Sequence, residues 1–304
     1  MKFRTELKLD KQIDEINYQS KIVSIGSCFA DSIGNKLSLL DFDVVSNPFG
    51  VLFNPYAIKN ALQGEINEEH FIHRDNNFYH LDYHSELFAN TEAGLIIKLI
   101  KQFDLANQQL KNSDYLIITF GTAWAYTYTK TKKVIANCQK VPQVNFTKEL
   151  LNLETLQLIY ESFFSNLFNA NNKLKIILTV SPVRHIKDGL HENNLSKSTL
   201  LLLAEFLKNR FDNVRYFPAY ELIVDDLRDY RFYKEDMIHP NEQAIQYVFT
   251  KFADCYFTEK TKKAVAVKES ILKLSSHRTS NAGVEQSAIA IQLEELEKEF
   301  NSLK

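Results

Sequence analysis

Five short runs of apolar residues constrain the fold more than any other feature of the sequence. Most are rich in Ile, Val, Leu, Tyr or Phe and do not alternate strictly with polar residues. That pattern is typical of strands buried on both faces of a parallel sheet. The five runs are Lys21–Ile25, Asp43–Ser46, Tyr115–Phe120, Lys175–Val180 and Val214–Phe217.

Helical patterns separate several of these strands. Apolar residues recur at helical spacing after Ser27, and Asn54-Pro55 reads as a helix cap followed by a first-turn proline, with Gly64 ending that helix. Alternating strands and helices favour right-handed crossovers. We therefore predict a three-layer, doubly wound α/β fold with a mostly parallel, flavodoxin-like five-stranded sheet. Further helices are predicted at Leu150–Phe168, at Leu195–Phe211 and from Pro240-Asn241 onward.

Two segments stand outside this alternation. Residues Ala125–Ala136 read as a β-hairpin inserted after the third core strand. From about residue 260 the chain becomes polar, and Ile291, Leu296 and Phe300 then recur roughly at helical spacing among glutamates. We expect one domain over residues 1–259 and a helical appendage over residues 260–304. We expect the appendage to pack on the domain or on a partner subunit, and in the second case it makes a homo-oligomer. The alternative is a partly frayed helix in solvent.

Composition argues against several classes of function. The 36 basic and 38 acidic side chains give a net charge of −2, which argues against a broad nucleic-acid footprint. No run of about 18 apolar residues indicates a membrane span. The first ten residues hold no apolar signal-peptide core, and the three cysteines form no C-x-x-C pair. We expect a cytoplasmic protein with neither nucleic-acid nor membrane partners.

Four histidines lie within fifteen residues, at positions His70, His73, His80 and His84. Such spacings occur in zinc sites, but no H-E-x-x-H pattern and no nearby cysteine accompany them. We expect no metal here, and instead a lid or a surface excursion. The sequence has no Walker A motif and no strand-linked G-x-G-x-x-G, so no cofactor is expected.

The first motif that carries chemistry follows the first strand, where Gly26 precedes Ser27 at the start of a helix. Ligands of open parallel sheets bind beyond the carboxyl ends of the strands. A helix N-terminus there stabilises developing negative charge. A serine in this place also serves simply as a helix cap, and both interpretations stay open.

The second motif is Asp236-Met-Ile-His239-Pro240. A serine hydroxyl is a weak nucleophile until a base takes its proton, and histidine suits that task. A carboxylate three residues earlier can orient the imidazole and stabilise its charged form. The alternative is an Asp turn before a helix, with an incidental histidine.

Together the motifs resemble a known family. Gly26-Ser-Cys-Phe-Ala30 spells the name motif of the GSCFA-domain proteins, a branch similar to the SGNH (GDSL-type) hydrolases. The resemblance runs from about Lys21 to Phe257, with serine near its start and D-x-x-H-P near its end. Further matching strings are Ser46-Asn-Pro-Phe-Gly50, Thr119-Phe-Gly-Thr-Ala-Trp124, Asn137-Cys-Gln-Lys-Val-Pro142, Ser181-Pro-Val-Arg-His185 and Leu227-Arg-Asp-Tyr-Arg-Phe-Tyr233.

The resemblance implies a catalytic triad in which Ser27 is the nucleophile, His239 the base and Asp236 its orienter. It also implies an oxyanion hole that uses the backbone N–H groups of Ser27 and Gly50. The third block departs from the SGNH pattern, because Ala123 stands where an asparagine donor is expected. Candidate substitutes for that donor are Asn47, Asn54, Thr122 and Asn137.

Several residues are candidates for the rim of the site. Arg184 and His185 follow the fourth core strand, where they could bind an anionic group or a sugar hydroxyl, although Arg184 could instead pair with Asp188. Asn137 and Lys140 could line the same mouth, and a surface lysine is the alternative for Lys140. Separate from the rim, Cys28 is either a second nucleophile or a small residue buried under the helix.

These expectations lead to a serine esterase that cleaves small acyl esters through an acyl-enzyme. Analogy with SGNH carbohydrate esterases suggests a carbohydrate alcohol. An O-acyltransferase with the same triad and a non-catalytic binding protein that retains the pocket are the alternatives. A Ser27 side chain turned away from His239 would favour the binding protein.

Overall fold

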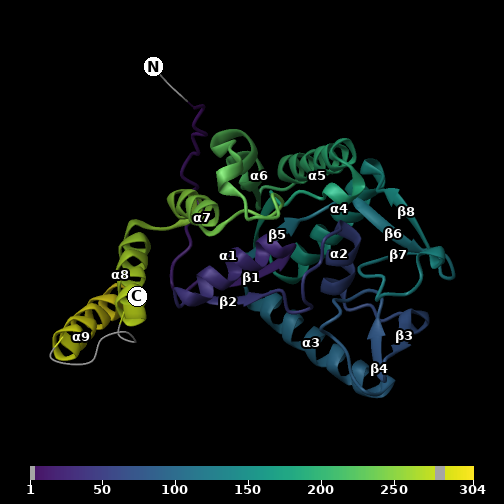
Figure 1. Cartoon of the computed structure of the whole chain (residues 1–304), viewed down its shortest axis with the longest axis horizontal. Coiled ribbons are helices and arrows are strands. Elements are labelled where there is room, and N and C mark those ends of the chain that lie inside the picture. The colour runs from purple at the N-terminus through teal and green to yellow at the C-terminus, as the bar shows by residue number, and fades with distance from the viewer. Residues whose placement is uncertain (1–3, 278–284) are drawn as a thin grey trace.

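The computed structural model describes the backbone of residues 4–277 and 285–304, and the side chains of residues 4–275 and 289–304. Its centre is a five-stranded sheet in which every strand runs parallel to its neighbours (Figure 1). The spatial order is β10-β9-β5-β1-β2. The strands are β1 (Lys21–Gly26), β2 (Asp43–Ser46), β5 (Tyr115–Phe120), β9 (Lys175–Val180) and β10 (Val214–Tyr216).

The predicted doubly wound α/β fold is confirmed. All five predicted strands are present, and the chain crosses from β2 at one edge back over β1 to β5. This is the flavodoxin-like strand order, with its topological switch point between β1 and β5. In this strand order a crevice is expected at the carboxyl ends of these two strands, where Ser27 follows β1 and Gly121 follows β5.

Helices cover both faces of the sheet. One face packs against α2, α3, α4 and α5, and the opposite face packs against α1 and α7. Side chains alternate along each strand, so that Val23 and Ile25 point to the first face and Ile22 to the second. The helices are α1 (Cys28–Leu39), α2 (Pro55–Gln63), α3 (Glu92–Asn112), α4 (Leu153–Ala170), α5 (Leu190–Arg210) and α7 (Glu242–Tyr256).

Local sequence sets the ends of these helices. The Asn54 side chain accepts the Ala57 N–H, Pro55 occupies the first turn, and Gly64 ends α2 in the left-handed region at φ 75°. These are the predicted roles of all three residues. Asn241 caps α7 in the same way, by accepting the Ala244 N–H. The predicted helix from Leu150 instead begins at Leu153, because the residues up to Leu150 form a strand.

The predicted hairpin is confirmed and carries a third strand that was not predicted. Strand β6 (Trp124–Tyr128) pairs with β7 (Lys133–Ile135) and on its other side with β8 (Phe146–Leu150), antiparallel in both cases. A separate two-stranded ribbon joins β3 (Phe71–Arg74) to β4 (Asn77–His80). Most of β8 is exposed, which explains its weak apolar pattern.

The clustered histidines belong to this ribbon and its surroundings. His70 is buried between the Asp82 carboxylate, 2.7 Å from its Nδ1, and Thr131 Oγ1, 2.8 Å from its Nε2. His80 donates from Nε2 to the Asn67 carbonyl and accepts the Asp82 N–H at Nδ1. Burial of the ring is the largest cause that lowers the pKa of His80, to about 4. His70, through its bond to Thr131, joins the start of the ribbon to the β6–β7 turn.

The C-terminal segment forms two helices, α8 (Glu259–His277) and α9 (Glu285–Leu303), and residues 278–284 lie outside the described part. Leu293 and Phe300 of α9 are buried in the same core cluster as α1 and α7. Phe300 packs edge-on against Tyr18, with ring centroids 5.4 Å apart. In this structure the appendage therefore packs against the rest of the chain.

Short elements complete the described chain. The α-helical turn α6 (Ala219–Glu221) continues into a π-helical turn, and single 3₁₀ turns link several loops. The π-helical turn spans Leu222–Leu227, and the 3₁₀ turns span Glu68–His70, Gln143–Asn145, Ile186–Asp188 and Tyr230–Phe232. Within the described ranges, every helix is too short or too polar to cross a membrane.

Candidate active site

A pocket of about 400 Å³ opens beside the crevice at the carboxyl ends of the strands. Its wall combines Cys28 from the start of α1, Thr122 from the loop after β5, and His185 from the loop after β9. His239, which precedes α7, closes another part of the wall. Residues separated by more than 200 positions in sequence therefore meet at the place where open α/β sheets bind ligands.

Gly26 fixes the path of the chain into this pocket. Its φ is 141°, and a Cβ on this residue would lie 2.1 Å from the Thr119 carbonyl oxygen. Only glycine fits so close to β5. The next residue, Ser27, is 1% exposed and caps α1, because its Oγ accepts the Phe29 N–H at 3.3 Å.

His239 and Asp236 form a hydrogen-bonded pair. Asp236 Oδ2 lies 2.7 Å from His239 Nδ1, and Asp236 Oδ1 accepts the backbone N–H groups of Ile238 and His239. The bonds from His239, followed by the Ile238 N–H, lower the pKa of Asp236 to about 2. A proton on Nδ1, held by this carboxylate, leaves Nε2 with the lone pair that a general base needs.

The structure brings Ser27 and His239 to the same end of the sheet without joining them. Ser27 Oγ keeps its bond to the Phe29 N–H, and no hydrogen bond links it to His239. The residue that reaches the pocket wall is its neighbour Cys28, which is partly exposed. Burial, the largest cause, raises the pKa of the Cys28 thiol, and this disfavours a resting thiolate.

The predicted oxyanion donors already have acceptors within the protein. The Ser27 N–H donates to the Thr119 carbonyl at 3.1 Å, and the Gly50 N–H donates to the Asn47 carbonyl at 2.8 Å. The Asn47 side chain accepts the Gly26 N–H and donates to Asp31. Their part in an oxyanion hole stays a prediction, and it requires each group to exchange its present partner.

Of the other candidates for the missing donor, Thr122 and Asn54 are also engaged, whereas Asn137 is bonded only through its side-chain oxygen and does not line the pocket. Thr122 Oγ1 lies 3.0 Å from Ser196 Oγ and accepts the Trp124 N–H. The Asn54 side chain donates to the Ile135 carbonyl as well as capping α2. The Asn137 side chain accepts the Gln139 N–H. Ala123 itself is fully buried, and its N–H donates to Ser196 Oγ at 2.7 Å.

Of the predicted rim residues, Arg184 and His185 line the pocket, whereas Asn137 and Lys140 are not part of its wall. Arg184 is held over the ring of Tyr230, with its guanidinium carbon 5.7 Å from the ring centroid. Asp188, the partner considered for Arg184, instead forms an ion pair with Lys148. Lys140 is an exposed residue on the turn after β7.

Two buried nitrogen groups lie behind this rim. The Nε2 of His185 is sealed from solvent and has no hydrogen-bond partner. Burial, followed by the nearby Lys197 ammonium, lowers the pKa of His185 to about 4. Lys197 is 1% exposed and donates to the carbonyls of Gly121 and Ser181 at 2.6 and 2.7 Å. Burial lowers the pKa of Lys197 to about 7.

Comparison with protein families tests the resemblance to GSCFA proteins that the motifs suggested. The family model for GSCFA matches residues 21–252, which is most of the chain and includes every residue of the pocket described above. The chain belongs to the GSCFA family. No curated protein matches it.

Sequence reasoning missed Lys197 in this GSCFA chain. The inward face of α5 carries buried residues at helical spacing, and Lys197 occupies one of these positions together with Asn193 and Leu200. A lysine at a buried position of an amphipathic helix was the available signal. Trp124 was also missed. Its indole N–H donates to the Glu192 carbonyl, and its ring lines the pocket.

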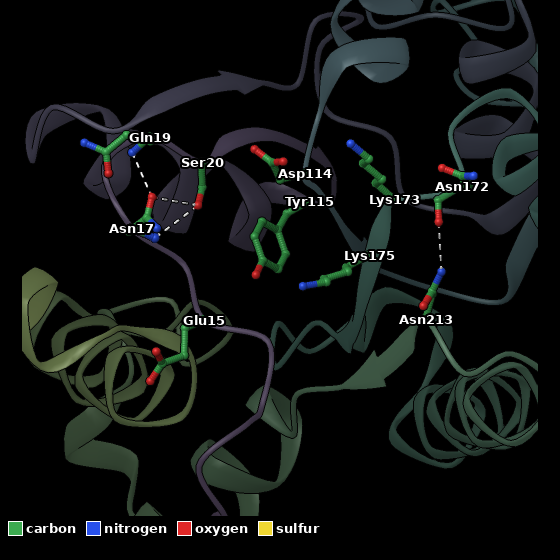
Figure 2. A pocket seen from close by; sticks show the side chains of 10 residues that line it. All are labelled: Glu15, Asn17, Gln19, Ser20, Asp114, Tyr115, Asn172, Lys173, Lys175 and Asn213. Carbon is green, nitrogen blue, oxygen red and sulfur yellow. Dashed lines mark hydrogen bonds between the residues drawn. The ribbon is translucent and has the colours of Figure 1, made fainter.

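A second hollow of the GSCFA domain, of about 570 Å³, lies at the opposite, amino ends of β5 and β9 (Figure 2). Tyr115 and Lys175 begin those strands, and Asp114 accepts the Lys21 N–H at 2.8 Å beside them. Lys175 is paired with Asp14 of the N-terminal segment. These contacts fasten that segment to the sheet, on the side away from His239.

Proposed function

We propose that this GSCFA protein is a serine hydrolase that cleaves small acyl esters through an acyl-enzyme. The observation that carries the proposal is the Asp236–His239 pair at 2.7 Å, with its imidazole on the wall of a pocket beside the residue after Ser27. The order of serine, aspartate and histidine along the chain resembles that of SGNH hydrolases and supports the same assignment.

The proposed reaction begins when Ser27 Oγ leaves its cap bond to the Phe29 N–H and turns toward His239. His239 Nε2 takes the hydroxyl proton as Oγ attacks the ester carbonyl carbon, and Asp236 stabilises the imidazolium. The tetrahedral intermediate collapses, and the alcohol leaves with the proton from His239. Water then attacks the acyl-enzyme with His239 as base, which releases the carboxylic acid and restores Ser27.

The lining of the pocket supports a small ester as the substrate. Trp124, Tyr126 and Phe53 provide flat apolar surfaces, and Arg184 stands at the rim. Aromatic side chains present both an apolar face and a polar edge, which suits an acyl group attached to a sugar. A carbohydrate alcohol is therefore the leaving group we propose, by analogy with other SGNH esterases.

One observation favours a second candidate. The Ser27 side chain is buried in its capping bond and makes no hydrogen bond to His239. A binding protein that retains the pocket without catalysis would keep the serine in this position. The choice between the two candidates depends on whether Ser27 reacts.

Labelling with a fluorophosphonate probe tests the proposal. We expect the wild-type protein to be phosphonylated at Ser27, as located by peptide mass spectrometry, and the Ser27→Ala and His239→Ala variants to remain unlabelled. Cys28→Ala is the matched control and should be labelled like the wild type. Absence of labelling in folded wild-type protein would establish the binding-protein candidate instead.

A further inference from the structure

The candidate site lacks one of the hydrogen-bond donors that an SGNH-type oxyanion hole would have. The position that should supply an asparagine donor is Ala123, and its backbone N–H is already bonded to Ser196 Oγ. The side chains of Asn47, Asn54 and Thr122 are bonded within the fold. A hydrolase with this site needs a polar hydrogen to stabilise the negative charge that develops on the carbonyl oxygen.

His185 has the one ring atom on the pocket wall that is both buried and without a partner. Its Nε2 is sealed from solvent and makes no hydrogen bond within the described residues. An unpaired buried polar atom is destabilising, and native structures keep few of them. A partner supplied by a bound molecule accounts for such an atom in a pocket wall.

The surroundings hold the His185 ring in place. The ring meets Phe53 edge-on, with centroids 5.8 Å apart, and the backbone N–H of His185 donates to the buried Asn193 side chain. Cys28 and His239 line the same pocket. Because Nε2 is sealed in this structure, donation to a substrate requires the ring or the rim around it to shift when the substrate binds.

The charge state of His185 also suits this task. Burial and the Lys197 ammonium lower the pKa of His185 to about 4, so the ring is neutral near pH 7. A neutral imidazole with its proton on Nε2 donates a hydrogen bond without carrying a charge that must be neutralised. Lys197 lies behind the pocket, with N–H groups on the carbonyls of Gly121 and Ser181.

We propose that His185 is a catalytic residue that donates a hydrogen bond from Nε2 to the oxyanion of the tetrahedral intermediate, in place of the asparagine absent at Ala123. The inference rests on the proposed serine hydrolase. It assigns to His185 a role in the transition state, beyond contact with the rim of the substrate.

Kinetics of three variants test the inference. His185→Phe keeps an aromatic ring and removes the donor, His185→Gln keeps an amide donor, and His191→Phe makes the same change at an exposed position of α5. We expect His185→Phe to lower kcat for p-nitrophenyl acetate, and the rate of fluorophosphonate labelling, about 10²–10³-fold with KM little changed. His185→Gln should recover at least tenfold of that loss, and His191→Phe should match the wild type.

Proton NMR of the wild-type protein provides a test that is independent of how the variants fold. Phosphonylation of Ser27 should produce one new downfield imidazole N–H resonance, assigned to His185 Nε2 by nitrogen-15 labelling and by its absence in His185→Gln. Wild-type reaction with unchanged rates in His185→Phe, or without the new resonance, would overturn this inference and leave the hydrolase intact. A wild-type protein that neither hydrolyses esters nor takes the probe would overturn both.

Discussion

The turn from Asp236 to His239 shows how single residues set the chemistry. Met237 adopts a left-handed backbone conformation with φ 56°, which residues other than glycine rarely adopt. This conformation lets one Asp236 oxygen accept two backbone N–H groups while the other faces the imidazole. The exposed carboxylate is thus held by local backbone geometry.

Replacement of the carboxylate tests this turn. We expect Asp236→Asn to lower kcat for ester hydrolysis about 10³–10⁴-fold, because an amide cannot stabilise the imidazolium and favours the wrong tautomer. Glu235→Gln, an exposed neighbour, should leave kcat unchanged. Because the pKa of Asp236 is about 2, its carboxylate stays ionised down to about pH 3, so the loss of activity between pH 7 and pH 4 should not follow its titration. Equal rates in Asp236→Asn and the wild type would contradict the role of base orienter.

For single residues, the sequence predicted which residues form the candidate site better than it predicted where their side chains point. The residue types and order of Ser27, Asp236 and His239 identified a pair that the structure joins by a hydrogen bond. The direction of the Ser27 side chain depends on competition between the Phe29 N–H and His239, which no motif encodes. The partners of the Ser27 and Gly50 N–H groups depend on strand register and turn geometry, so their engagement was equally hidden.

At the scale of elements, α5 stands out because a charged side chain joins it to the sheet. Lys197 bonds the carbonyls that follow β5 and β9, and these are the loops that carry Thr122 and His185. A buried ammonium loses its hydration, and two carbonyl acceptors only partly replace it. The lowered pKa of Lys197, about 7, expresses that cost.

This linkage predicts a pH-dependent stability. Between pH 7 and 9.5 the unfolded chain keeps a proton on Lys197 that the folded chain has lost, so this group makes the free energy of unfolding rise with pH. The slope is at most about 1.4 kcal/mol per pH unit. We expect the free energy of unfolding of Lys197→Met to rise less with pH than that of the wild type, as measured by urea denaturation across this range.

Lys208→Met serves as the control for this prediction, since Lys208 is an exposed lysine of the same helix. Its slope should match that of the wild type. Parallel slopes for Lys197→Met and the wild type would show that the Lys197 side chain keeps its proton in the fold.

The strands of the central sheet were the elements most accurately predicted. Asp43–Ser46, Tyr115–Phe120 and Lys175–Val180 have the bounds that their apolar runs predicted, and the last two are buried along most or all of their length. The strands that were missed, β3, β4 and β8, lie outside the central sheet, and their side chains are partly exposed. Helix α3 was also not predicted, although Leu95, Leu99 and Phe103 lie on its buried face at helical spacing.

At the scale of the whole molecule, the C-terminal helices α8 and α9 pack against the segment from Tyr18 to Phe42. Phe300 of α9 is 4% exposed and packs against Tyr18, which in turn stacks on Phe42 at 4.4 Å. Lys268 of α8 also pairs with Asp41. The appendage is thereby part of the core that covers one face of the sheet.

Truncation of the Phe300 side chain measures how much the packing of α9 contributes to stability. We expect Phe300→Ala to lower the free energy of unfolding by about 3–4 kcal/mol, because it leaves a cavity beside Tyr18. Ile291→Ala, on the same helix but 61% exposed, should change it by less than about 0.5 kcal/mol. Guanidinium denaturation of both variants provides the comparison. A small effect of Phe300→Ala would mean that α9 does not stay packed on the domain in solution.

The position of β1 between β2 and β5 has a consequence for the order in which the protein is made. β1 can pair with β2 soon after both strands are synthesised, but its pairing with β5 waits about ninety residues, and His239 is synthesised more than 200 residues after Ser27. Parallel sheets of such long sequence separation fold slowly. Ser27 and its proposed base therefore meet only after more than 200 further residues have been synthesised, and a chain that ends before His239 carries the proposed nucleophile without the group proposed to activate it.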